Sequence, residues 1–221
     1  MAATGYADTV TPVGLAPGTK YQLVFVTADG FFGNSSSIST YNTDVGDEAA
    51  LDAQLASFDT ANSVTWTVVG TTPSVNADVN APSSGLVYTL NGTEVASSAA
   101  SLYSGALLAP IDINQYGNAE NTLVWTGSNT NGTNTNPFYE LGGTFPIEGS
   151  STSSGGGWVN DTTGIEADNN LALYALSSVI TVPFSSTIPE PSPVVLVPVA
   201  VLLLSLGIRG WRRKLSVGRT S

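Results

Sequence analysis

The alternation of apolar and polar positions predicts a series of short β-strands joined by polar loops. The clearest strand is 21–27, Tyr-Gln-Leu-Val-Phe-Val-Thr, where β-branched and aromatic residues dominate and the middle is apolar on both faces. We expect this strand to lie at the centre of its sheet. The Asn91-Gly92 step predicts a tight hairpin turn. The other predicted strands are the apolar runs at 63–69, 86–90, 94–95, 123–127, 158–159 and 171–182.

One segment changes from the strand pattern to a helical pattern. Carboxylates from Asp44 onward are followed by an alanine-rich run. Leu51, Leu55 and Phe58 recur at steps of four and three residues, which places them on one face of a helix. We therefore expect a helix that begins at Asp44 or Asp47, where a carboxylate can cap it, and buries that face.

Oxygen-bearing side chains alternate at Asn76, Asp78 and Asn80, two residues apart as in calcium-binding loops. The glycine that turns an EF-hand loop is missing, and no glutamate follows at the required distance. We interpret this segment as a turn. The carboxylates of the predicted helix are interpreted as capping and solvent-facing groups. No metal ion and no cofactor is expected.

The C-terminal segment differs from the rest of the chain in hydropathy and charge. A polar break at 189–191 precedes an apolar run over 194–208. Of the six Lys and Arg residues, five follow Ile208, and Lys20 is the only one before it. The positive-inside rule places such a cluster on the cytoplasmic side of a membrane. We expect a transmembrane helix over 194–211 and a basic anchor made of Arg209, Arg212, Arg213 and Lys214.

This three-part tail resembles the PEP-CTERM sorting signal of exported proteins in Gram-negative bacteria. In that family an exosortase, a membrane enzyme, recognises the tail. The resemblance covers 188–214 and implies that Pro189, Glu190 and Pro191 are a recognition motif and not a catalytic site. It implies a protein that is exported, anchored in the inner membrane before processing, and then located at the cell surface or outside the cell. Exopolysaccharide is a candidate partner, because species with this signal often make it.

The composition of the body excludes several classes of function. Without Glu190 of the tail, sixteen of the seventeen carboxylates remain beside one Lys, so binding of nucleic acid is disfavoured. The chain has no His and no Cys, which excludes the common zinc, haem and thiol chemistries and a Ser-His-Asp triad. Paired carboxylates remain as acid–base chemistry, but no motif fixes a pair. We expect no enzymatic activity.

The domain organisation follows from these boundaries. Residues 1–19 have neither a basic start nor a long apolar run, so they do not form a Sec signal peptide, and we expect the true start to lie upstream. The expected order is this N-terminal segment, an extracellular body over 20–184, a linker with the sorting motif over 185–193, the transmembrane helix over 194–211, and a basic cytoplasmic tail over 212–221.

Short motifs in the body resemble the endostatin-like branch of the C-type-lectin-like fold. They are Leu-Asn-Gly at 90–92, Ser-Gly at 104–105 and Val-Trp-Thr-Gly-Ser at 124–128. The resemblance implies an α+β domain with a twisted antiparallel sheet and one or two helices. The disulfides and the calcium–sugar tripeptides of that superfamily are absent, so calcium-dependent sugar binding is not carried over.

The expected function is that of an exported, C-terminally sorted protein of the cell surface or extracellular matrix, with a structural or adhesive role. A carbohydrate- or calcium-binding lectin-like module, using the Asn-rich loops and exposed aromatic residues, remains the alternative.

Overall fold

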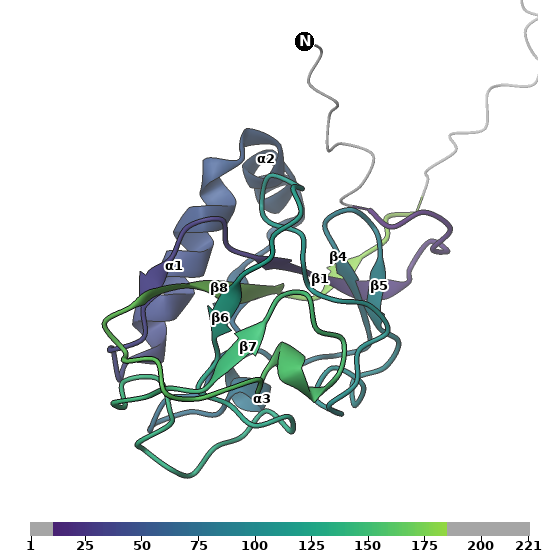
Figure 1. Cartoon of the computed structure of the whole chain (residues 1–221). Coiled ribbons are helices and arrows are strands. Elements are labelled where there is room, and N and C mark those ends of the chain that lie inside the picture. Colours follow the sequence, from purple (N-terminus) through teal and green to yellow (C-terminus); the bar gives the residue numbers. More distant parts are fainter. Residues whose placement is uncertain (1–10, 185–221) are drawn as a thin grey trace, which may run out of the picture. The chain divides into compact units, whose positions relative to one another are not determined.

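Strand β1 (Lys20–Val26) lies in the middle of a mixed β-sheet in the computed structural model, which describes residues 11–184 (Figure 1). It pairs in parallel with β4 (Leu86–Thr89) and antiparallel with β8 (Asn170–Ser177) and β9 (Ile180–Thr181). Six of the seven residues of β1 are buried. The predicted central strand is therefore confirmed.

Strand β8 joins the two halves of the sheet, whose main order is β5-β4-β1-β8-β6-β7. Besides β1, it pairs with β2 (Phe31–Phe32), β3 (Trp66–Val68) and β6 (Leu123–Trp125). The edge strands β5 (Glu94–Ala96) and β7 (Glu148–Ser150) pair antiparallel with β4 and β6. The result is a mixed sheet curved into a half-barrel.

Two parallel pairings show that the expected fold was wrong. Tyr21 is in register with Leu86 between β1 and β4, and Val124 with Ala172 between β6 and β8. Parallel neighbours need a long crossover, and here the chain passes through three helices and the strands β2 and β3 between β1 and β4. The C-type-lectin-like domain with an antiparallel sheet is therefore not the architecture of this body. Alternating apolar positions mark a strand but carry no information about its direction.

The predicted helix exists but has different bounds. Helix α1 (Ile38–Leu51) begins before Asp44, and a second helix, α2 (Ala53–Asn62), follows after a break at Asp52. Asp52 has an extended backbone, and its Oδ1 accepts hydrogen bonds from the backbone N–H of Gln54 and Leu55 at 3.0 and 2.8 Å. The break turns Leu51 out of the expected buried face: its side chain is 57% exposed, whereas Leu55 is buried.

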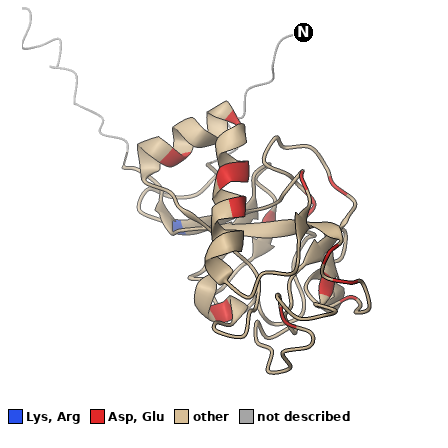
Figure 2. Cartoon of the chain, turned by 90° about the vertical axis from the view of Figure 1, so that its left-hand side faces the viewer, with Lys and Arg blue, Asp and Glu red and all other residues tan. Residues whose placement is uncertain are grey.

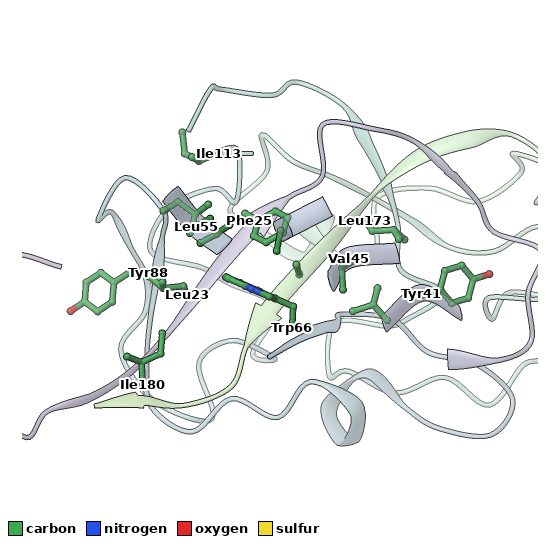
Figure 3. Packing of buried hydrophobic residues seen from close by; sticks show 14 of the residues in the cluster. Leu23, Phe25, Tyr41, Val45, Leu55, Trp66, Tyr88, Ile113, Leu173 and Ile180 are labelled. Carbon is green, nitrogen blue, oxygen red and sulfur yellow. The ribbon is translucent and has the colours of Figure 1, made fainter. Parts of the chain in front are cut away.

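Two hydrophobic clusters, each made by one face of β1, form the core. Leu23 and Phe25 belong to the first cluster, and Val24 and Val26 belong to the second, as the two-residue period of a strand requires. Figure 3 shows the first cluster around Trp66, whose ring lies 4.8 Å from that of Phe25 at an angle of 68°. Because both faces of β1 are covered, the strand is apolar throughout its middle.

Local turns agree with the sequence in one place and differ in another. The hairpin between β4 and β5 is confirmed: Gly92 has φ +84°, and Thr89 N–H donates to the Thr93 carbonyl at 2.9 Å. The expected strand at 158–159 is instead the end of a 3₁₀ turn, η2 (Gly156–Trp158), which buries Trp158 against Tyr174. Trp and Val favour strands, but here Trp158 N–H bonds back to Gly155.

No helix within residues 11–184 is both long and apolar enough to cross a membrane. The expected transmembrane helix at 194–211, the motif at 189–191 and the basic anchor lie outside the described residues. Most of the N-terminal segment, 1–10, lies outside them as well.

Candidate functional site

The alternating residues Asn76, Asp78 and Asn80 do not form a ligand set. They lie in and just before a short helix, α3 (Ala77–Asn80), where a plain turn was expected. Asn76 Oδ1 accepts from the backbone N–H of Asn134 at 3.2 Å, and Asn80 Nδ2 donates to the Val68 carbonyl at 2.8 Å. Among residues 11–184 no group of three or more acidic side chains is placed to hold a metal ion.

A pocket of about 510 Å³ lies between two loops that are far apart in the sequence. One loop follows β3 and leads into α3, and the other lies between β6 and β7. We call it the loop pocket. Its lining residues are Thr72, Pro73, Ser74, Val75, Asn76, Val79, Asn134, Thr135, Pro137 and Glu140.

Backbone hydrogen bonds hold the two loops of the pocket together. Leu141 N–H donates to the Thr71 carbonyl at 2.9 Å, and Asp78 N–H donates to the Gly132 carbonyl at 3.1 Å. Thr71 also accepts from Ala77 N–H through its Oγ1 at 3.0 Å. Because these bonds tie the two loops directly to each other, the walls of the pocket are held in place by the fold.

Asn134 fixes the shape of the second loop. Its side chain is buried, and its Oδ1 accepts from the N–H groups of Thr135 and Asn136 at 2.8 and 3.0 Å. Its Nδ2 donates to the carbonyl of Gly127 at 3.0 Å. An asparagine that bonds the backbone one and two residues ahead mimics a backbone turn, so this polar loop has a defined conformation.

Glu140 is the charged group of the loop pocket. Its side chain is only 5% exposed, and burial raises the pKa of its carboxyl group. Within residues 11–184 no hydrogen-bond donor or cation contacts this carboxylate. Its oxygens are not among the buried polar atoms that lack a partner, so they reach solvent through the pocket. The carboxylate oxygens of Glu140 are therefore able to accept a hydrogen bond from a ligand that enters the pocket.

The other buried glutamates accept hydrogen bonds from the protein. Glu48 of α1 accepts from Gln115 Nε2 at 2.5 Å and from Asp29 N–H at 3.4 Å. Glu148 of β7 accepts from Ile165 N–H at 3.1 Å. Burial raises the pKa of both carboxyl groups. These two glutamates hold neighbouring segments together, whereas Glu140 does not.

Neutral polar groups complete the lining of the pocket. The hydroxyls of Thr72 and Ser74 are hydrogen-bonded to each other at 3.2 Å. The Nδ2 of Asn76 and the hydroxyl of Thr135 have no partner within the described part of the chain. The lining contains no Lys or Arg, and Lys20 is the only cation between residues 11 and 184. The pocket therefore presents one anionic acceptor among neutral donors and acceptors.

An aromatic group lies on the same loop as the pocket lining. Phe138 follows the lining residue Pro137, and its side chain is 46% exposed. Its ring centroid lies 5.4 Å from that of Tyr139 and 5.4 Å from that of Phe145. The two ring contacts hold Phe138 in the loop, and much of its apolar side chain remains exposed.

The sequence interpretation missed Glu140. The one signal that could have found it is its isolation, because it is the only charged residue between Glu120 and Glu148. A single glutamate carries no spacing pattern, and its burial depends on two loops that meet only in the folded chain.

Comparison with known proteins places the chain in no family: no protein-family model matches it, and no curated protein matches it. Residues and geometry are therefore the basis for assigning a function.

Proposed function

We propose that this chain is an exported protein whose acidic body has a structural or adhesive role at the cell surface or in the extracellular matrix. Its C-terminal segment acts as a PEP-CTERM-type sorting signal, read by an exosortase-type enzyme. The observation that carries the proposal is the segregation of charge, with five of the six Lys and Arg residues after Ile208.

The described body supports the same proposal. Of the seventeen carboxylates of the chain, Asp8 and Glu190 lie outside residues 11–184, which leaves fifteen beside the single Lys20. Figure 2 shows the acidic positions spread over helices and loops. A body with this charge repels nucleic acid and the anionic surface of a membrane. A membrane anchor whose end stays in the cytoplasm requires basic residues in that end and few of them in the exported body.

A structural role fits the carboxylates better than catalysis does. Hydrolysis by an acid–base pair needs two carboxyl groups that face one scissile bond. The loop pocket is lined by one carboxylate, Glu140, while Glu48 and Glu148 accept hydrogen bonds from the scaffold. The lectin-like alternative loses the fold on which it was based, because the sheet is mixed.

Cell fractionation tests the sorting proposal. The chain is expressed behind an export signal in a Gram-negative host with an exosortase and in the same host without it. We expect a shortened form at the surface or in the medium only when the enzyme is present. A triple Ala variant of Pro189, Glu190 and Pro191 should remain unprocessed in the inner membrane, and so should a variant that lacks 209–221.

Lys20→Gln is the matched control, because it removes a cation from the body and leaves the tail intact. Sorting of this variant should equal that of the unmodified chain. Unchanged processing and location after deletion of 209–221 would show that the tail is not a sorting signal.

A further inference from the structure

We propose that the loop pocket binds a primary ammonium group, with the carboxylate of Glu140 as its anionic partner. The ammonium group can belong to an amino sugar, a lysine side chain or a free amine, which share this chemistry. The proposal goes beyond the sorting and structural role and does not depend on it, because it is tested on the purified protein.

The first argument is the missing partner of Glu140. The Glu140 side chain is only 5% exposed, and its carboxylate oxygens reach solvent on the side of the pocket. Folded proteins normally replace the hydration that such a group loses with hydrogen bonds or a cation. Glu48 accepts such bonds, and Glu148 accepts one through Oε1, although its Oε2 is buried without a partner. Glu140 has none within residues 11–184, although it lies in a preformed pocket. A cation in the pocket would supply the interaction that the fold leaves out.

The second argument is the sign of the charge around the pocket. Fifteen carboxylates and one Lys between residues 11 and 184 give the body a negative potential that concentrates cations and repels anions. No basic side chain lines the pocket. Phosphate, sulfate and carboxylate ligands are therefore disfavoured, and a positively charged ligand is favoured.

The third argument is the match between the lining and an ammonium group. An ammonium group has three donors and no acceptor. Glu140 accepts at least one, and the hydroxyl oxygens of Thr72, Ser74 and Thr135 are acceptors in the same lining. Apolar side chains on the same walls suit the carbon atoms that carry the amine, namely Pro73, Val75, Val79 and Pro137. Those four side chains lack the oxygens that a metal ion needs.

A divalent cation fits the lining less well. Calcium takes six to eight oxygen ligands and usually several carboxylates. The pocket has one carboxylate, and no group of three or more acidic side chains that could hold a metal occurs between residues 11 and 184. A monovalent cation that needs one anionic partner is the better match.

The test is a calorimetric titration of the full chain, purified in detergent micelles, near neutral pH. Glucosamine, glucose and N-acetylglucosamine share a ring but differ at one position, where only glucosamine is cationic. Nα-acetyl-lysine amide and its Nε-acetylated form make the same comparison for a side chain. We expect each cationic probe to bind at least about tenfold more tightly than its neutral counterparts, because a charge-assisted hydrogen bond is stronger than one between neutral groups.

Two variants locate the interaction. Glu140→Gln keeps the size of the side chain but removes its charge, and it should lower the affinity for the cationic probes by about tenfold or more. Glu166→Gln removes an exposed carboxylate elsewhere and should leave the affinity unchanged. Equal affinities of the two variants for glucosamine would overturn the proposal.

The probe comparison decides the question even if Glu140→Gln does not fold. Equal binding of glucose, N-acetylglucosamine and glucosamine would show a neutral saccharide site and overturn the ammonium proposal. Binding of calcium in place of every amine would overturn it in favour of a metal site. Absence of binding by all probes would also overturn it.

Discussion

The side-chain amides of Asn42 and Asn80 donate hydrogen bonds to each other, at 3.1 and 3.0 Å, across the gap between α1 and α3. Both side chains also bond Val68 of β3: Asn42 Oδ1 accepts from its N–H at 2.9 Å, and Asn80 Nδ2 donates to its carbonyl at 2.8 Å. The two side chains thus satisfy the backbone N–H and carbonyl of Val68 in the way that a neighbouring strand would, on the side of β3 away from β8. It also links α1 to the helix that follows the first loop of the pocket.

Replacing Asn80 should show the contribution of this pair to stability. Asn80→Ala leaves the Val68 carbonyl without its donor, and we expect the free energy of unfolding to fall by about 1–3 kcal/mol. Urea denaturation followed by tryptophan fluorescence measures the change. Asn62→Ala is the control, since Asn62 Nδ2 bonds Phe58 O on the exposed end of α2, and its loss should cost much less. Equal losses in the two variants would contradict a structural role for the pair.

The break between α1 and α2 depends on Asp52. Asp52→Ala removes the acceptor for the N–H groups of Gln54 and Leu55, so we expect a loss of about 1 kcal/mol in the free energy of unfolding. Thermal denaturation followed by circular dichroism measures it. Asp47→Ala removes an exposed carboxylate within α1 and serves as the control. A Tm for Asp52→Ala equal to that of the control would show that the cap does not stabilise the second helix.

Asp59 should make the stability of the body depend on pH. Burial raises the pKa of its carboxyl group to about 6, although a hydrogen bond of 2.7 Å from Trp66 Nε1 opposes the shift. Because the folded pKa lies above the unfolded value, the folded state binds more protons between these values. The contribution of Asp59 to stability therefore increases as the pH falls from about 7 toward 4.

Asp59→Asn isolates this contribution from those of the other buried carboxyl groups. The Tm of the variant should vary less between pH 7 and pH 5, values on either side of the folded pKa, than the Tm of the unmodified chain. Asp168→Asn, at an exposed position, should leave the pH dependence unchanged. An identical pH profile for Asp59→Asn and the unmodified chain would contradict the assignment.

Gly127 should be essential to the closure of the loop pocket. It has φ +58°, and a Cβ placed there would lie 2.5 Å from Leu141 N and 2.7 Å from Thr71 O. Gly127→Ala combines backbone strain with a clash, and we expect a loss of about 3 kcal/mol or more. Gly14→Ala has a similar φ of +88° but nothing within 4 Å of its Cβ, so it measures the strain alone. If both variants lose the same stability in urea denaturation, the clash is absent.

The sequence predicted those parts of the fold whose structure is set by neighbouring residues in the chain. The strand at 21–27 is apolar on both faces because two clusters cover it, and Asn91-Gly92 turns the chain by itself. Asp52 illustrates the limit of such patterns. A carboxylate in an alanine-rich run suits a helix surface or an N-cap equally well, and only packing decides between them.

The direction of the strands and the position of Glu140 were not predictable from local pattern. The parallel pairing of β1 with β4 depends on a crossover through three helices and two short strands. The pairing of β6 with β8 depends on the path through β7 and η2. Glu140 becomes a pocket residue only because Leu141 bonds Thr71, seventy positions earlier in the chain. Contacts between residues so far apart in the chain produce no periodic pattern of apolar and polar residues in the sequence.

Strand β8 gives the body a particular order of assembly. Its pairing joins Val24 to Leu176, so one edge of β1 and the strand edge of β3 lack their partner until the last part of the body is available. Such distant contacts slow folding and keep an emerging chain unstructured for longer. The sheet therefore cannot be completed before residue 177 has been synthesised, and the body depends on its last strand for a closed core.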